Sequence, residues 1–136
     1  MPIIDPKLIA AIIAPLLIWP FVPAWDAGYL KDGDIRVLAM FLLLPVAEEV
    51  VFRGFLQGWL LRRAAFKRGR IGISGANLVT SVAFALAHLW QHPALLFPGY
   101  FAVSLVLGYF RERYGGVLVP ILLHSYYNLG LWAFAG

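Results

Sequence analysis

The chain has 136 residues, of which 62% are hydrophobic and 13% charged, and its mean hydropathy is +0.80. A soluble domain of this size carries about a quarter charged residues, so the composition excludes a water-soluble globule and predicts an integral membrane protein. The absence of cysteine excludes disulfides and thiolate metal sites. The basic residues behind the net charge of +4 stand at the ends of apolar segments. That placement is typical of topology signals, so no nucleic-acid partner is expected.

Five apolar segments follow one another along the chain, separated by polar turns: Pro6 to about Pro23, Ile35–Leu61, Ile71–Trp90, Leu95–Phe110 and Val117–Ala135. Since about 20 apolar residues cross a bilayer as a helix, the predicted fold is all-α, a polytopic transmembrane helical bundle of about five segments. The first and fourth segments are short, and either could be re-entrant. No repeat or soluble region interrupts the pattern, which predicts a single domain over residues 1–136.

Local signals refine these segments. Trp19 and Trp25, at the far end of the first segment, suit a membrane interface. Pro45 lies one turn before a pair of glutamates and is expected to free a backbone carbonyl and bend its helix. Ser74 is a suitable helix N-cap for the third segment. The N-terminus lacks a basic stretch followed by a cleavage motif, so we expect the first segment to be retained in the mature protein.

The positive-inside rule gives one orientation for the five segments. Lys7, the pair Arg111 and Arg113, and a dense basic loop would be cytoplasmic, the loop being formed by Arg62, Arg63, Lys67, Arg68 and Arg70. The polar loop from Trp25 to Arg36 and the uncharged turn at Gln91 would be outside. We therefore predict a cytoplasmic N-terminus and an external C-terminus, most simply in a prokaryotic inner membrane.

Two adjacent carboxylates and an arginine lie within the second apolar segment, as Glu48-Glu49-Val50-Val51-Phe52-Arg53. Charges inside a bilayer are costly and survive mainly where they pair and serve a function. Glu49 and Arg53 are four residues apart, on one helical face and in the favourable order. Glu48 is turned about 100° away from that pair. The spacing predicts a structural Glu49–Arg53 ion pair and a second carboxylate that faces a different group.

Further polar residues lie in other apolar segments, notably His88 in the third and His124 with Asn128 in the fifth. A single intramembrane histidine usually makes an interhelical hydrogen bond, but so many polar groups on three helices favour a shared cavity. A carboxylate, two imidazoles and an amide suit activation of water and binding of an oxyanion. Other intramembrane protease motifs are missing, since the sequence contains no G-x-S-x-G, no H-E-x-x-H and no aspartate within an apolar segment.

The three motifs Glu48-Glu49-x-x-x-Arg53, Phe84-x-x-x-His88 and His124-x-x-x-Asn128 resemble those of the CPBP family, over about residues 41–129. These are the CAAX-processing and bacteriocin-processing intramembrane proteases, also called the Abi family, which includes the Rce1-type CAAX endopeptidases. The resemblance implies an all-helical membrane endopeptidase that acts on a membrane-embedded or lipid-anchored peptide or protein.

The resemblance also implies residue roles. Glu48 with His88 would activate the water, His124 with Asn128 would form the oxyanion site, and Glu49 with Arg53 would orient the first glutamate. The set Glu48, His88 and His124 could hold zinc with an open position, but the resemblance favours a glutamate mechanism without a cofactor.

Substrate class and mechanism stay open between several alternatives. The substrate could be CAAX-like, a peptide undergoing maturation, or a C-terminal sorting signal. A non-catalytic immunity or scaffold protein on the same fold is the second hypothesis, and a small transporter using the carboxylates is the third. The oligomeric state is not predicted.

Overall fold

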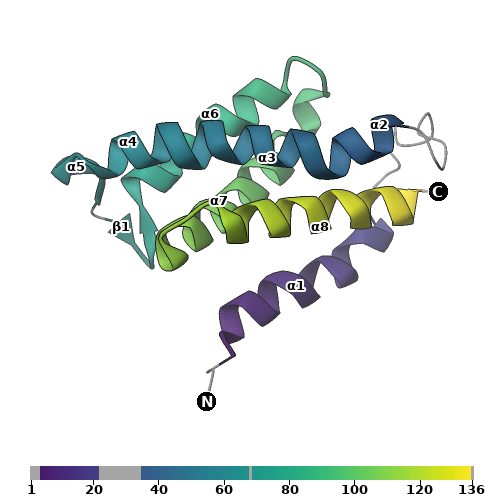
Figure 1. Cartoon of the computed structure of the whole chain (residues 1–136), viewed down its shortest axis with the longest axis horizontal. Helices are drawn as coiled ribbons and strands as arrows, with labels where there is room; N and C mark the ends of the chain where they lie inside the picture. The colour runs from purple at the N-terminus through teal and green to yellow at the C-terminus, as the bar shows by residue number, and fades with distance from the viewer. Residues whose placement is uncertain (1–3, 22–34, 68, 136) are drawn as a thin grey trace. The chain divides into compact units, whose positions relative to one another are not determined.

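The computed structural model describes residues 4–21, 35–67 and 69–135, and its regular structure there is almost entirely helical (Figure 1). The α-helices are α1 (Pro6–Ile18), α2 (Ile35–Leu38), α3 (Leu44–Glu49), α4 (Gly58–Leu61), α5 (Ala64–Lys67), α6 (Gly75–His88), α7 (Phe97–Tyr114) and α8 (Leu118–Ala135). They are joined by the 3-10 segments η1 (Trp19–Phe21) and η5 (Ala94–Leu96) and by the π-helical segments η3 (Ala39–Leu43) and η4 (Val50–Gln57). A short hairpin precedes α6, and each of its strands, β1 (Gly69–Arg70) and β2 (Ile73–Ser74), has two residues. The predicted all-α class is confirmed.

The second predicted segment is confirmed over the described residues, because helical backbone runs from Ile35 to Leu61. It alternates between α and π geometry, and π segments are rare and frequently found at functional sites. In η3 the Leu44 N–H bonds to the Ala39 carbonyl, five residues back. In that register the Met40 carbonyl would pair with residue 45, which is a proline without an N–H. Pro45 thus frees a carbonyl, as predicted.

The third and fourth predicted segments need correction. Residues 71–74 form the hairpin turn and β2 rather than helix, because Ile71 and Gly72 have positive φ angles of 54° and 79°. Helix α6 begins at Gly75, and Ser74 caps it by accepting the Asn77 N–H at 3.0 Å, as predicted. Helix α7 continues past the predicted end and stops at Tyr114, followed by Gly115 in the left-handed conformation.

The longer fourth segment has a consequence for the membrane. The run Ala94–Tyr114 has 21 residues and a mean hydropathy of 1.4, which by length and composition is enough to cross a bilayer. Pro6–Phe21 and Gly75–His88 are apolar but shorter. Within the described ranges this is one clear candidate span, so the number of five spans stays a prediction.

The chain divides into two compact units, one formed by residues 1–46 with 122–136 and the other by residues 47–121. In the second unit α6 and α7 run antiparallel, because Ser74 contacts Glu112 while Asn77, further along α6, contacts the earlier residue Leu105. Segment η4 and α7 run parallel, because Arg53 contacts Ser104 and Gln57 contacts Gly108.

In the first unit, side chains of α8 hold α1. The Tyr127 hydroxyl donates to the Ala11 carbonyl at 2.9 Å, and Ala11 is the carbonyl that Pro15 leaves without a helical donor. Trp19 is buried, and its ring lies against Gly130, where a Cβ would collide with it. Trp19 therefore packs inside the first unit, and its predicted position at the membrane interface stays a prediction. Trp25, the polar loop around it, the far end of the first predicted segment and Arg68 lie outside the described residues.

Candidate active site

The predicted Glu49–Arg53 ion pair is present and fully buried in the second unit. Arg53 Nη1 donates to Glu49 Oε1 at 3.1 Å, Nε lies 3.1 Å from Oε2, and both side chains are 0% exposed. The guanidinium also donates from Nη2 to the Ser104 backbone oxygen at 3.1 Å and to its hydroxyl at 2.6 Å. Because a buried ion pair needs further hydrogen bonds to offset its desolvation, Ser104 is part of the pair's support.

A buried polar ladder continues this pattern toward the C-terminal end of α7. One turn after Arg53, Gln57 Nε2 donates to the Gly108 carbonyl at 3.0 Å and to Glu112 Oε1 at 2.8 Å. Glu112 also accepts from the Ser74 hydroxyl at 2.5 Å. The contacts advance in steps of four on both helices, so one polar stripe locks η4 against α7.

Helix α6 is attached to α7 by a second set of polar contacts. Asn77 Nδ2 donates to the Leu105 carbonyl at 2.9 Å, and Asn77 Oδ1 accepts from the Ser81 hydroxyl at 3.1 Å. A Cβ at Gly108 would collide with the Asn77 amide, so glycine is required for this approach. These polar residues of α6 therefore serve helix packing and position His88 at the end of the same helix.

Glu48 and His88 come together at the other end of the second unit. His88 Nε2 lies 4.0 Å from Glu48 Oε2, and the side chains of His88 and Glu48 are 17% and 28% exposed. His88 Nδ1 lies 2.8 Å from the Phe84 backbone oxygen. A carbonyl oxygen can only accept, so Nδ1 carries the proton and donates, and in the neutral ring Nε2 is the basic nitrogen. The nitrogen that faces Glu48 is therefore the basic one.

Aromatic rings fix the imidazole of His88. Its centroid lies 4.3 Å from the Phe84 ring and 4.4 Å from the Tyr100 ring, with interplanar angles of 38° and 27°. Two rings at stacking distance cannot share one face of an imidazole, so His88 is held between them. Tyr100 also lies near His92, at 5.4 Å between centroids, and close enough to Glu48 for an electrostatic interaction. Phe84, which shares a motif with His88, thus packs against the imidazole.

His124 and Asn128 lie one turn apart on α8, in the first unit. Asn128 Nδ2 donates to the Met40 carbonyl at 3.2 Å, the carbonyl left without a helical donor by Pro45. Since an amide nitrogen carries two hydrogens, this bond orients Asn128 and leaves one N–H beyond it. Glu48, Glu49, Arg53 and His88 belong to the second unit.

The sequence alone did not single out Tyr100, Ser104, Gln57 and Glu112. Gln57 could have been found by continuing the spacing of four from Glu49 through Arg53. Glu112 stands between two arginines and looks like the charged end of a helix, while Tyr100 and Ser104 are ordinary residues of an apolar segment. Their roles depend on contacts with residues far away in the chain.

No group of three or more His, Asp or Glu side chains that could hold a metal ion occurs among residues 4–21, 35–67 and 69–135. Within the second unit the carboxylate of Glu49 is engaged by Arg53, and the ring of His92 lies 6.3 Å from that of His88, between centroids.

Fold and site together define a predominantly helical protein with a buried ion pair beside a carboxylate–imidazole pair. Residues 34–130 match the family of Type II CAAX prenyl endopeptidase Rce1-like proteins, and the chain belongs to this family. The matched range contains all six candidate residues. The family assignment confirms the resemblance seen in the motifs.

Among curated proteins, the chain is 34% identical over 95 residues to an uncharacterized 24.3 kDa protein of Escherichia coli. The match covers 70% of this chain and 42% of the relative, so the chain spans less than half of that protein's length. No solved structure matches the chain.

Proposed function

We propose that this protein is an intramembrane endopeptidase in which Glu48 and His88 activate a water molecule to hydrolyse a peptide bond of a membrane-associated substrate. The observation that carries the proposal is the 4.0 Å separation of Glu48 Oε2 and His88 Nε2, with Nδ1 already engaged by Phe84. That separation is too long for a direct hydrogen bond and suits a bridging water.

The geometry orients such a water. When a water oxygen lies about 2.8 Å from both atoms, the angle Oε2–O–Nε2 at the water is roughly 90°, which is near the H–O–H angle of water. Both protein atoms are acceptors, so the water donates one hydrogen to each and its lone pairs point away from them. Glu48 or His88 then removes a proton as the oxygen forms a bond to the substrate carbonyl carbon. The proton is passed to the departing amine when the C–N bond breaks.

The ion pair supports this arrangement. Arg53 holds Glu49 on the buried face of the helix, and Glu48, which directly precedes Glu49, lies on a different face. The contacts of Arg53 and Gln57 with α7 then fix the rotation of the segment. We therefore assign Glu49 and Arg53 a positioning role toward Glu48.

The developing oxyanion needs hydrogen-bond donors. We propose His124 and Asn128 for that role, on the basis of their i,i+4 spacing and of the family assignment. The bond from Asn128 to Met40 supports the proposal, because it fixes the amide and still leaves one N–H for the substrate.

The substrate we propose is a membrane-embedded or lipid-anchored peptide or protein, of the CAAX-like, peptide-maturation or C-terminal sorting-signal kind. The family description names prenyl endopeptidases, which act on lipid-modified chains. We propose an inner-membrane location with a cytoplasmic N-terminus, on the distribution of basic residues.

The test compares cells that lack the protein after complementation with the wild type or with Glu48→Gln at matched membrane levels. The termini of all membrane proteins and membrane-bound peptides are then determined by mass spectrometry. The glutamine is isosteric and keeps the packing, but it is a far weaker base. We expect at least one terminus that is present with wild type and reduced about a hundredfold or more with Glu48→Gln.

His92→Gln serves as the control, because His92 is also a histidine near Tyr100 and has no role in the proposed step. Equal termini with wild type and Glu48→Gln would contradict the protease and favour an immunity or scaffold role. Treatment with a chelator distinguishes the zinc alternative, since the proposed mechanism predicts unchanged cleavage and a zinc site predicts its loss.

A further inference from the structure

The hairpin before α6 is strained at its tip. Gly69 pairs with Ser74 and Arg70 with Ile73, so Ile71 and Gly72 form a two-residue turn. Both have positive φ, at 54° and 79°, which is the geometry that favours Asn-Gly. A β-branched residue with positive φ is in a rare and strained conformation. Isoleucine is therefore an unfavourable choice for the turn itself.

The same isoleucine is almost fully exposed. Its exposed fraction is 94%, so the described part of the chain buries very little of its side chain to offset the strain. In water both features are costly, and Asn or Gly would remove both. An apolar molecule outside the protein that covered the side chain would offset both the strain and the exposure.

The position of the hairpin indicates that this molecule is a lipid. Ser74 bonds to Glu112, and a Cβ on Gly72 would lie 3.4 Å from the Tyr109 ring. The hairpin therefore lies beside the last two turns of α7, where the candidate span Ala94–Tyr114 ends. A span leaves the hydrocarbon at its ends, so with Ala94–Tyr114 as a span the hairpin would be at the depth of lipid headgroups.

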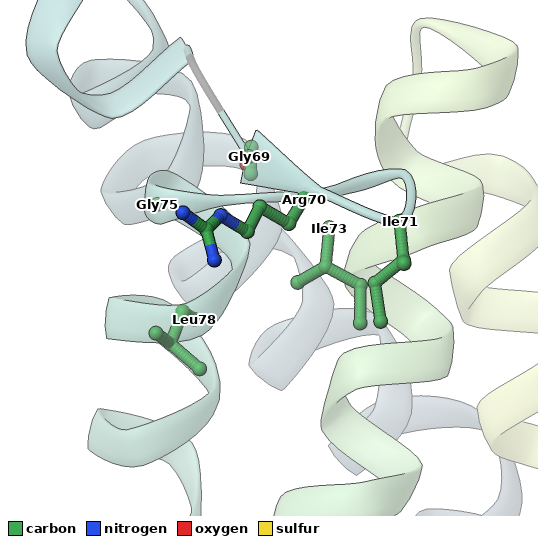
Figure 2. Close-up of a pocket in the computed structure, with 7 residues that line it drawn as sticks. Gly69, Arg70, Ile71, Ile73, Gly75 and Leu78 are labelled. Atoms are coloured by element: carbon green, nitrogen blue, oxygen red, sulfur yellow. The ribbon is translucent and has the colours of Figure 1, made fainter.

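A hollow of about 330 Å³ lies between the hairpin and the start of α6, lined by Gly69, Arg70, Ile71, Ile73, Ser74, Gly75 and Leu78. Figure 2 shows the guanidinium of Arg70 reaching toward Gly75, while the side chains of Ile71 and Ile73 point together to one side. Leu78 lies one turn further along α6 and is 48% exposed. The hollow thus combines one cation with an apolar wall.

The side chain of Arg70 makes no hydrogen bond or ion pair within the described residues, and Arg70 belongs to the same basic stretch as the exposed cations Arg62 and Lys67. Such a basic cluster at a membrane surface attracts anionic lipids. Arg70 differs from the other two because it lines the hollow.

We propose that the hollow binds one anionic phospholipid, whose phosphate is held by Arg70 and whose upper acyl chains lie against Ile71, Ile73 and Leu78. The site explains the strain and exposure of Ile71 in a single role, since the side chain is buried by the lipid. It is separate from the Glu48–His88 pair and does not depend on the proposed protease activity.

The experiment measures lipid binding to the full chain in neutral detergent micelles by native mass spectrometry. Dioctanoyl phosphatidylglycerol is titrated against dioctanoyl phosphatidylcholine, which has the same chains and no net charge. We expect a saturable single phosphatidylglycerol site that Arg70→Gln weakens about tenfold or more. Arg62→Gln removes the same charge from the same loop outside the hollow, and we expect it to weaken binding less than twofold.

Ile71→Asn separates lipid contact from folding. Because asparagine relieves the positive-φ strain, we expect an equal or higher unfolding temperature in lipid-free micelles together with severalfold weaker phosphatidylglycerol binding. Equal binding of the two lipids, or equal effects of Arg70→Gln and Arg62→Gln, would overturn the proposal. Competition by millimolar inorganic phosphate would also overturn it, because it would indicate an ion site without a role for the acyl chains.

Discussion

At the scale of single residues, the site depends on the orientation of one imidazole. His88 is fixed by the bond from Nδ1 to the Phe84 carbonyl and by two aromatic rings. An enzyme gains from such restraint, because a base that is already oriented needs no reorganisation during the reaction. The restraint comes from residues that take no proton themselves, and it can be tested through them.

We predict that the ring of Tyr100, rather than its hydroxyl, matters for His88. Tyr100→Phe keeps the stacking partner and should retain cleavage within about twofold, whereas Tyr100→Leu should lower it about tenfold or more. The measurement is the rate at which the Glu48-dependent terminus appears, at equal protein levels. If Tyr100→Phe were as defective as Tyr100→Leu, the hydroxyl would have to act directly in the reaction.

The Glu49–Arg53 pair leads to a prediction about stability. Removing one member of a buried ion pair leaves an uncompensated charge and costs about 3–5 kcal/mol. We therefore expect Arg53→Met and Glu49→Gln each to lower the unfolding temperature strongly, in detergent and with the wild type as reference. The double variant should be more stable than Arg53→Met alone, because it buries no charge. Additive losses would show that the two side chains act separately.

At the scale of helices, one arrangement occurs twice: a proline leaves a backbone carbonyl without a donor, and a side chain of α8 donates to that carbonyl. Pro15 and Pro45 each leave a carbonyl of their own helix without a donor, and Tyr127 and Asn128 supply the donors to Ala11 and Met40. Unsatisfied carbonyls cost several kcal/mol in a membrane. The prolines can therefore be tolerated because neighbouring residues of α8 complete the backbone hydrogen bonds.

This arrangement predicts coupling between Pro45 and Asn128. Asn128→Ala should destabilise the protein by about 1–3 kcal/mol, since it leaves the Met40 carbonyl unsatisfied. In a Pro45→Ala background, residue 45 has an N–H that can reach this carbonyl, and the same substitution should cost much less. Reversible unfolding in detergent for all four proteins of the cycle measures the coupling. Equal losses in both backgrounds would mean that Asn128 does not replace the missing donor.

Helix bounds were predicted correctly where they depend on local sequence signals, and they were missed where they depend on contacts with distant residues. The helical run from Ile35 to Leu61 and the cap at Ser74 were correct because apolar periodicity and N-caps are local properties. The end of α7 was missed because Arg111 and Glu112 look solvent-exposed. In the structure they bond to Arg53 and Gln57, more than fifty residues away.

The candidate site shows the same division. The Glu49–Arg53 pair follows from a spacing of four and was predicted from the residues themselves. The approach of Glu48 to His88 needs the packing of η4 beside α6. The cost of polar groups in lipid predicted a shared cavity, and the family resemblance implied this particular pair. Tyr100 was missed because its contact with His88 has no local signal in an apolar segment. The hairpin was missed because its isoleucines continue an apolar pattern.

At the scale of the whole molecule, the packing of α6 on α7 bears on which segments cross the membrane. Helix α6 has 14 residues, fewer than the roughly 20 that span a bilayer upright. It packs antiparallel on α7, however, and buries polar side chains against it, so its path is tied to that of the longer helix. The hairpin and the C-terminal end of α7 should then be on one side of the membrane and the turn at Gln91 on the other.

This arrangement predicts opposite accessibility for two positions. The chain contains no cysteine, so single cysteines can be introduced without changing the background. We expect Lys67→Cys in intact cells to react with a membrane-impermeant maleimide only after permeabilisation, because the basic loop is cytoplasmic by the positive-inside rule. Gln91→Cys should react before permeabilisation. If both positions reacted from the same side, α6 would not cross the membrane, and the turn carrying His92 would lie on the same side as the basic loop.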